Sequence, residues 1–304
     1  MDGSLFGTSG IRGDAESYFN DQFCFDLGRT FAIFLKNKFD QGGVAIGSDP
    51  RESSPRIKSS FSSGVIFEGL KIVDQGIAPI PSMNYILIVS NDNFAGSVMI
   101  SGSHIKASLN GLKFFAGKEE ILKTDEAQID EIYNSIKKLV KFRNLSGQIV
   151  YDPTAVQFYL DYLEKKAKVP YKKWKAVVDP GSGAQSGVIS NLLTKLGLDV
   201  VPVNDSNSKG FLARDTEVES DFESLKEEVK KNAADFGVGY DSDGDRAVFV
   251  DEKGAYITGD YTGTLVARMM PGKKIVTPIN TSAVIESIGK EVIRTKVGSP
   301  YVVF

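Results

Sequence analysis

The sequence has one cysteine, Cys24, one histidine, His104, and no long apolar segment. A lone cysteine cannot form an internal disulfide, and Cys24 sits in an apolar helical pattern, so we expect a buried structural thiol. A single histidine with no second Cys or His nearby does not indicate a zinc site. No stretch approaches the eighteen or so apolar residues that a membrane helix needs.

A strong excess of charge of either sign is also missing, because 36 Lys and Arg stand against 39 Asp and Glu in 304 residues. The N-terminus has no basic region followed by an apolar run. We therefore expect no nucleic-acid partner, no membrane association, no signal peptide and a cytoplasmic location. A composition that is 41% hydrophobic and 25% charged is typical of a globular protein.

Short apolar segments of strand length alternate with helical patterns along the chain. This alternation favours an α/β fold made of successive three-layer α/β/α domains with mixed, largely parallel sheets. We expect domains at residues 1–146 and 147–253, then a truncated third unit at 254–304, which is short for a domain. The expected strands are 44–47, 70–73, 97–100, 175–179, 200–203, 236–240, 247–250, 274–277 and 292–297. The expected helices are 21–34, 55–70, 82–89, 125–140, 156–166, 185–196, 222–231, 261–269 and 282–288.

The strongest chemical signal is Asp241-Ser-Asp243-Gly-Asp245-Arg246, which lies between two apolar strands. Three carboxylates at alternate positions repel one another unless a cation lies among them, although a charged hairpin turn is the alternative. An EF-hand calcium loop is disfavoured, since Arg246 stands where that loop needs glycine. Three carboxylates leave an open coordination position, which suits Mg²⁺ bridging to a phosphate oxygen.

Three weaker signals accompany the acidic one. Ser103 and His104 follow the strand 97–100, where catalytic loops commonly lie, but each alone is more often structural. The glycine-rich segment 7–13 carries Arg12, and such a segment can approach and clamp a phosphate. Asn110-Gly111 predicts a hairpin-type turn, with the basic Lys113 after it. Arg51, Ser53 and Ser54 form a further polar loop that we expect to be structural.

Taken together, these segments resemble the α-D-phosphohexomutase family. Residues 7–13 resemble its N-terminal arginine loop. Residues 101–104, with Asn110-Gly111-x-Lys113, resemble its phosphoserine loop, and residues 241–246 resemble its metal loop. Residues 47–51 and 76–81 also follow the family pattern, in the family order.

The resemblance implies roles for individual residues. Ser103 would carry the phosphoryl group, and Asp241, Asp243 and Asp245 would hold Mg²⁺ together with an oxygen on Ser103. Arg12, His104 and Lys113 would be catalytic, while Arg246 and Asn110 would bind phosphate or substrate. The implied enzyme is an isomerase, an intramolecular phosphotransferase that interconverts hexose 1-phosphate and hexose 6-phosphate. A hexose 1,6-bisphosphate would be its intermediate and activator.

Two departures from the family pattern stand out. The usual Asn-Pro after Ser-His is Ile105-Lys106, and the sugar-selecting loop and fourth-domain phosphate loop of the family are absent. Pro300 to Phe304 stand where the third domain should continue. We therefore expect a poor or inactive mutase from this chain alone, with a separate C-terminal half or a second copy as candidate protein partners.

Two other functions stay open at this point. One is a truncated, catalytically incompetent phosphosugar- or metal-binding protein, which the missing loops favour and the intact Ser103 and acidic triplet disfavour. The other is a phosphatase-like enzyme with an aspartate nucleophile, which would leave Ser103 and the arginine loop unexplained. The choice among glucose, mannose and glucosamine phosphate also stays open.

Overall fold

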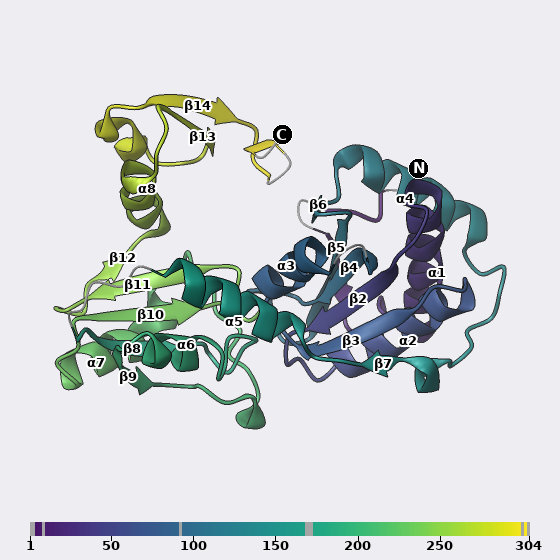
Figure 1. Cartoon of the computed structure of the whole chain (residues 1–304), viewed down its shortest axis with the longest axis horizontal. Coiled ribbons are helices and arrows are strands. Elements are labelled where there is room, and N and C mark those ends of the chain that lie inside the picture. The colour runs from purple at the N-terminus through teal and green to yellow at the C-terminus, as the bar shows by residue number, and fades with distance from the viewer. Residues whose placement is uncertain (1–3, 8–9, 91–92, 168–172, 299–300, 303–304) are drawn as a thin grey trace.

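The computed structural model describes residues 4–7, 10–90, 93–167, 173–298 and 301–302. It contains a 7-stranded, a 5-stranded and a 2-stranded sheet. Figure 1 shows the two larger sheets side by side, with the small third unit above the second. The predicted α/β fold with mixed, largely parallel sheets is confirmed. Within the described ranges, no helix has the length and apolar character needed to cross a membrane.

The first sheet combines a parallel part with an antiparallel edge. Strands β4, β2, β3 and β7 run parallel, whereas β5 pairs antiparallel with β1, β4 and β6. In sheet order the strands are β1 (Ile11–Asp14), β5 (Leu109–Ala116), β4 (Phe94–Ile100), β2 (Gly43–Ser48), β3 (Ile72–Ile77) and β7 (Val150–Tyr151), with β6 (Glu119–Glu120) beside β5.

Helices cover both faces of this sheet. On one face Phe31 and Phe61 pack with Phe114 of β5, and on the other Met83 packs with Met99 of β4. The helices are α1 (Asp21–Lys38), α2 (Ser54–Phe67), α3 (Ile80–Val89) and α4 (Lys123–Ile136). The buried Cys24 lies within α1, and burial raises the pKa of its thiol to about 12, as expected for a structural cysteine.

The second sheet has the same three-layer plan. Strands β10, β8 and β9 run parallel, and β11 and β12 complete an antiparallel edge. Leu225 and Val229 of α7 cover one face, while Ile189 and Leu193 of α6 cover the other. The elements are β8 (Lys175–Asp179), α6 (Ile189–Lys195), β9 (Asp199–Pro202), α7 (Glu223–Lys231), β10 (Phe236–Tyr240), β11 (Ala247–Asp251) and β12 (Tyr256–Ile257).

The segment that connects the two larger sheets contributes to the first of them. β7 joins the first sheet, and α5 (Ala155–Lys166) puts Ala155 into the cluster under α3. The third unit comprises α8 (Gly259–Met269), β13 (Lys274–Pro278) and β14 (Glu291–Thr295), the last two paired in parallel. Short 3-10 helices are η1 (Ser146–Gln148), η2 (Asn207–Lys209), η3 (Glu219–Phe222) and η4 (Ala283–Ile288).

Several local predictions are wrong. Asn110 and Gly111 lie inside β5 rather than in a hairpin turn, because β1 pairs with them, while β4 pairs with the rest of β5 from Leu112 onward. Arg12 lies on the strand β1 instead of in a glycine loop. Residues 185–188 precede α6, and the segment predicted as the helix 282–288 forms the 3-10 helix η4 over 283–288, with Ser282 as its N-cap. Thr8, Ser9, Pro300 and Phe304 lie outside the described residues.

Candidate active site

The site forms where the strand ends of the two larger sheets meet. Ser103 follows the carboxyl end of β4, and Asp241 follows the carboxyl end of β10. Ser103 is completely buried, and its hydroxyl donates a hydrogen bond of 2.8 Å to Asp241 Oδ2. Ser103 has a φ of +54°, an uncommon backbone conformation for serine. Strain of this kind is often stored at functional sites.

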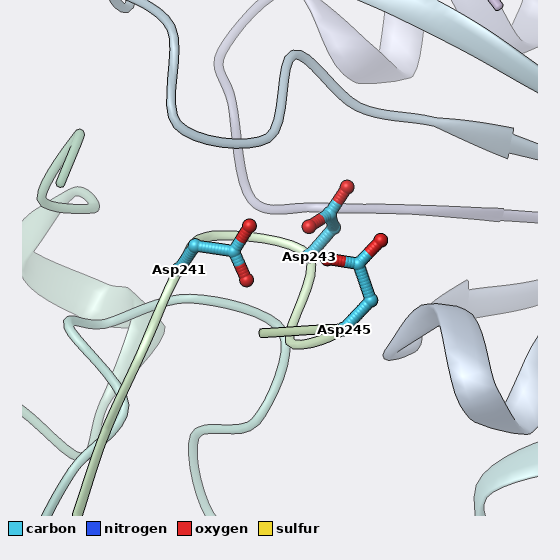
Figure 2. Close-up of side chains that lie close together, drawn as sticks. All are labelled: Asp241, Asp243 and Asp245. Carbon is cyan, nitrogen blue, oxygen red and sulfur yellow. The ribbon is translucent and has the colours of Figure 1, made fainter. Parts of the chain in front are cut away.

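The three predicted metal ligands gather in the turn between β10 and β11. One oxygen from each of Asp241, Asp243 and Asp245 lies within 4.8 Å of the others, and Figure 2 shows the three side chains close together. Gly244 adopts a φ of +68°, where a Cβ atom would come within 2.5 Å of Gln185 Cγ. Glycine at this position therefore allows the tight turn that brings the carboxylates together.

The electrostatics of this turn fit a divalent cation. Burial, then repulsion from Asp243 and Asp245, raises the pKa of Asp241 to about 8. Asp243 is fully buried, which opposes its ionisation, yet its pKa is lowered because Lys113 stabilises the carboxylate. Its Oδ1 atom is buried without a hydrogen-bond partner among the described residues. An unpaired carboxylate oxygen inside a cluster of acids is a ready ligand for Mg²⁺.

Two basic residues reach this turn from the first sheet. Lys113 on β5 donates to Asp243 at 3.0 Å and to Asp245 at 2.9 Å. Burial alone would lower the Lys113 pKa, but the two carboxylates outweigh burial and the pKa is raised. Arg12 on β1 lies in the field of the same carboxylates, and its buried Nε has no partner within the described part of the chain.

Arg246 and His104 form the other side of the site. Arg246 Nη1 lies 3.2 Å from His104 Nδ1, which in turn lies 3.4 Å from the Ser103 hydroxyl. Burial, then the nearby Arg246 charge, lowers the His104 pKa, which favours the neutral form of the ring. Because Arg246 donates to Nδ1, the proton of the ring belongs on Nε2, which lies 4.0 Å from Asp215.

Asn110 is the one predicted site residue whose side chain is already engaged elsewhere. Its amide nitrogen donates to Ser53 at 2.8 Å and to Ser54 at 3.2 Å, and its Oδ1 accepts from the Gly111 backbone. The other predicted residues converge on one region. Those are Arg12, Ser103, His104, Lys113, Asp241, Asp243, Asp245 and Arg246.

Sequence reasoning gave no role to two polar side chains at the junction, Asp49 and Ser242. The Ser242 hydroxyl lies 2.6 Å from the Ser103 carbonyl and 3.1 Å from Asp49 Oδ2. Ser101 also donates to Asp49 Oδ2, at 2.7 Å. Asp49 could have been found from the sequence, because it belongs to the segment 47–51, which follows the family pattern. Nothing in the sequence singled out Ser242, because a serine between aspartates is common in a turn.

A cleft of about 630 Å³ opens beside Arg246, between the second sheet and the third unit. Its walls include Thr216, Tyr256, Asp260 and Asn280. These side chains offer hydroxyl, amide and carboxylate groups, which can hydrogen-bond a polar ligand. The cleft has room for a ligand of small-molecule size beside the arginine that contacts His104.

The fold and site define a class: an α/β protein that presents a buried serine to a carboxylate cluster suited to a cation, with arginine and lysine close by. Such a set of groups is suited to phosphoryl transfer. Residues 3–140 match the family model of phosphoglucomutase/phosphomannomutase α/β/α domain I, and residues 157–254 match that of domain II. The chain belongs to this family, the α-D-phosphohexomutases.

Curated relatives carry mutase names. A phosphoglucomutase/phosphomannomutase of Thermococcus kodakarensis is 34% identical over 310 residues, covering 97% of this chain and 67% of the relative. A phosphoglucosamine mutase of Carboxydothermus hydrogenoformans is 29% identical over 314 residues, covering 99% of this chain and 70% of the relative. The chain thus spans about two thirds of the length of these relatives.

Solved structures have the same fold. A phosphoglucomutase/phosphomannomutase family protein from Burkholderia thailandensis aligns with a TM-score of 0.82 at 21% identity, covering 98% of this chain and 67% of that one. An N-acetylphosphoglucosamine mutase from Aspergillus fumigatus, solved with GlcNAc-6P and magnesium, aligns at 0.55 and 16% identity. That alignment covers 98% of this chain and 63% of the fungal one. A serine-to-alanine variant of the fungal mutase, solved with glucose 1,6-bisphosphate, aligns at 0.53 and 14% identity, covering 99% and 64%.

Proposed function

We propose that this protein carries out the phosphoserine chemistry of a phosphohexomutase, interconverting hexose 1-phosphate and hexose 6-phosphate through a bisphosphate. The observation that carries the proposal is the 2.8 Å hydrogen bond between Ser103 and Asp241, which joins a loop of the first sheet to the carboxylate cluster of the second. A catalytically incompetent binding protein is the less favoured function, because this assembly of groups is intact.

In the proposed reaction Ser103 carries the phosphoryl group in the resting enzyme. A hydroxyl oxygen of a hexose monophosphate attacks that phosphorus and loses its proton, while the bond from phosphorus to Ser103 Oγ breaks. The serine oxygen leaves and is reprotonated. After the resulting bisphosphate has turned around, Ser103 attacks its other phosphorus and releases the isomeric monophosphate.

The basic side chains are assigned to charge neutralisation and proton transfer. Asp243 and Asp245 hold Lys113 in its protonated form, so Lys113 can give a proton to the departing serine oxygen and recover one from the attacking hydroxyl. Arg12 and Arg246 offer guanidinium groups to the phosphate, and His104, which accepts from Arg246 beside Ser103, would hold that guanidinium in place.

We propose that Asp241, Asp243 and Asp245 hold Mg²⁺, with Ser103 as a further ligand. When bound, the ion would neutralise negative charge that builds up on the transferring phosphoryl group. The unpaired Oδ1 of Asp243 and the strong mutual repulsion of the acids support this assignment. The magnesium in the fungal mutase structure is consistent with it.

The substrate class proposed is the hexose phosphates, with a hexose 1,6-bisphosphate as activator. The cleft beside Arg246 would hold the sugar, since it lies between the second sheet and the third unit and is lined by hydrogen-bonding groups. The fungal mutases bound to GlcNAc-6P and glucose 1,6-bisphosphate support this class. Glucose, mannose and glucosamine phosphates all remain candidates.

We propose that each of the three units contributes a different part of the site. Residues 1–146 present the phosphoserine loop, residues 147–253 present the metal loop, and residues 254–304 form one wall of the cleft. The Asn110 amide donates to Ser53 and Ser54. Its proposed role near the phosphate is therefore indirect and acts through these two serines.

The test is covalent labelling of the purified chain by glucose 1,6-bisphosphate in the presence of Mg²⁺. Intact mass should increase by one phosphate, and peptide mapping should place that phosphate on Ser103. Ser103→Ala should remove the labelling, whereas Ser108→Ala, at an exposed serine of the same loop, should leave it unchanged. Labelling that persists in Ser103→Ala, or that maps to Ser101, would refute the assignment.

A further inference from the structure

Arg51, in the segment after β2, is one of the largest fully buried side chains of the described residues. Its Nε donates to Asp49 Oδ2 at 3.0 Å, and each terminal nitrogen donates twice to backbone carbonyls. All four carbonyls belong to residues 103–109, which follow β4 and lead into β5. They are those of Ser103 at 2.7 Å, Ile105 at 2.8 Å, Lys106 at 2.7 Å and Leu109 at 2.8 Å.

The loop has hydrogen bonds of its own, from the Ile105 amide to the Gly102 carbonyl and from the Leu109 amide to the Lys106 carbonyl, and the Ser103 carbonyl also accepts from Ser242. The loop forms no helix or strand between β4 and β5, and buried carbonyls without partners are costly. Ser103 must also be kept at its positive φ of +54°. One planar guanidinium satisfies four carbonyls at fixed relative positions, which a lysine ammonium with three donors on one atom cannot reproduce.

The surroundings of Arg51 are built from both sheets. The ring of Phe211, from the second sheet's half of the chain, lies 4.6 Å from the Arg51 guanidinium carbon. Asp49, the ion-pair partner of Arg51, also contacts Ser242 of the metal loop. At Gly102, a Cβ atom would lie 2.6 Å from the Arg51 guanidinium carbon, so the loop passes directly over the arginine.

We propose that Arg51 is a positioning residue that holds the Ser103 loop in the one conformation from which the Ser103 hydroxyl meets Asp241. Arg51 touches the Ser103 backbone and not its hydroxyl, so it acts through the loop. The part of this inference that concerns phosphoryl transfer rests on the proposed function, while the part that concerns loop conformation does not.

The first experiment measures hydrogen–deuterium exchange in the metal-free full chain, comparing wild type with Arg51→Lys. The Ser103, Ile105 and Leu109 amides donate within the loop and should exchange about tenfold faster or more in the variant. Exchange in α1 should stay the same. The matched control is Arg29→Lys, since Arg29 is a buried arginine of the first unit that pairs with Glu68 and Asp26 rather than with residues 103–109.

A second variant approaches the same contact from the other side. Gly102→Ala keeps the arginine but puts a methyl group where the guanidinium lies, so it should loosen the same amides. The second experiment measures the rate at which glucose 1,6-bisphosphate labels each protein. Labelling of Arg51→Lys should be slower by about 100-fold, as expected when a reacting group is misplaced by about 1 Å, with little change in bisphosphate affinity.

The outcomes separate the two proposals. If loop exchange in Arg51→Lys and Gly102→Ala equals that of Arg29→Lys, the positioning role is wrong. If the loop is loosened but Ser103 is labelled at the wild-type rate, Arg51 does not set the reactive geometry and the inference is also overturned. If wild type is never labelled while the loop amides loosen as expected, the proposed function fails and the conformational role of Arg51 stands.

Discussion

At the scale of single residues, the site is a set of charges that the fold keeps close together. Asp241 is the clearest case, because burial and two neighbouring carboxylates disfavour its ionised form. Lys113 offsets this repulsion for Asp243 and Asp245, to which it is bonded directly. Asp241 instead accepts from the hydroxyl of Ser103 and the backbone of Arg246, which are neutral donors. The metal-free protein should therefore be strained at Asp241.

This strain predicts a pH dependence of stability for the metal-free protein. The pKa of Asp241 rises from 3.8 to about 8 on folding, so the folded state binds a proton that the unfolded chain has lost. Stability should therefore fall as pH rises from about 4 to about 8. Asp241→Asn has no ionisable group at this position, so it lacks this loss of stability with rising pH. At pH 8 the melting temperature of the variant should exceed that of wild type by about 2–4 °C for each ~1 kcal/mol of destabilisation removed.

The measurement is thermal unfolding in a chelator at pH 5, 6, 7 and 8, for wild type and Asp241→Asn. The difference in melting temperature should widen toward pH 8. A constant difference across this range would show that Asp241 does not carry the raised pKa.

At the scale of elements, the first unit depends on a close crossing of α1 and α2. Gly28 of α1 faces Phe61 of α2, and a Cβ atom at Gly28 would lie 2.0 Å from the Phe61 carbonyl oxygen. Gly64 of α2 faces the Phe25 carbonyl oxygen at the same distance. Two glycines thus let the helix backbones approach closely.

Gly28→Ala should therefore destabilise the protein, although alanine is the better helix former by about 1 kcal/mol. We expect a loss of about 1–3 kcal/mol, because the added methyl group forces the helices apart. Gly263 in α8 is the control, since a Cβ atom there would meet nothing within 4 Å. Gly263→Ala should leave stability unchanged or raise it slightly. Urea unfolding of both variants measures the two effects, and equal shifts would contradict the crossing argument.

At the scale of the whole molecule, the site lies between the two larger sheets. Contacts from the first to the second include Ser103 to Asp241 at 2.8 Å and Lys113 to Asp243 at 3.0 Å. The backbone amide of Ile80 also donates to the Asp243 carbonyl at 3.0 Å. An ion bound among the carboxylates should therefore stabilise the second unit directly and the first through these contacts.

Calorimetry with and without Mg²⁺ tests this expectation. Mg²⁺ at about 100 times its dissociation constant should stabilise the wild-type protein by about 2.7 kcal/mol. Asp243→Asn loses a ligand and should show little of this stabilisation, while remaining folded without metal. If the variant gains as much from Mg²⁺ as wild type does, the ion binds elsewhere.

The sequence by itself determined the fold class and the acidic, basic and hydroxyl groups from which the candidate site is built. Strand segments such as 175–179 and 236–240 were predicted with the bounds that the structure has, because their apolar runs and flanking turns are local signals. The aspartates at alternate positions indicated a cation for an equally local reason, since their repulsion follows from spacing alone.

Only the tertiary structure decided which groups meet. Asn110 and Gly111 have the composition of a turn, yet they lie in β5 because the distant strand β1 pairs with them. Arg51 looked like an ordinary polar loop residue, and only the fold brings four carbonyls from residues 103–109 onto its guanidinium. Pairing between distant segments depends on backbone groups that every residue carries, so local residue types do not reveal it.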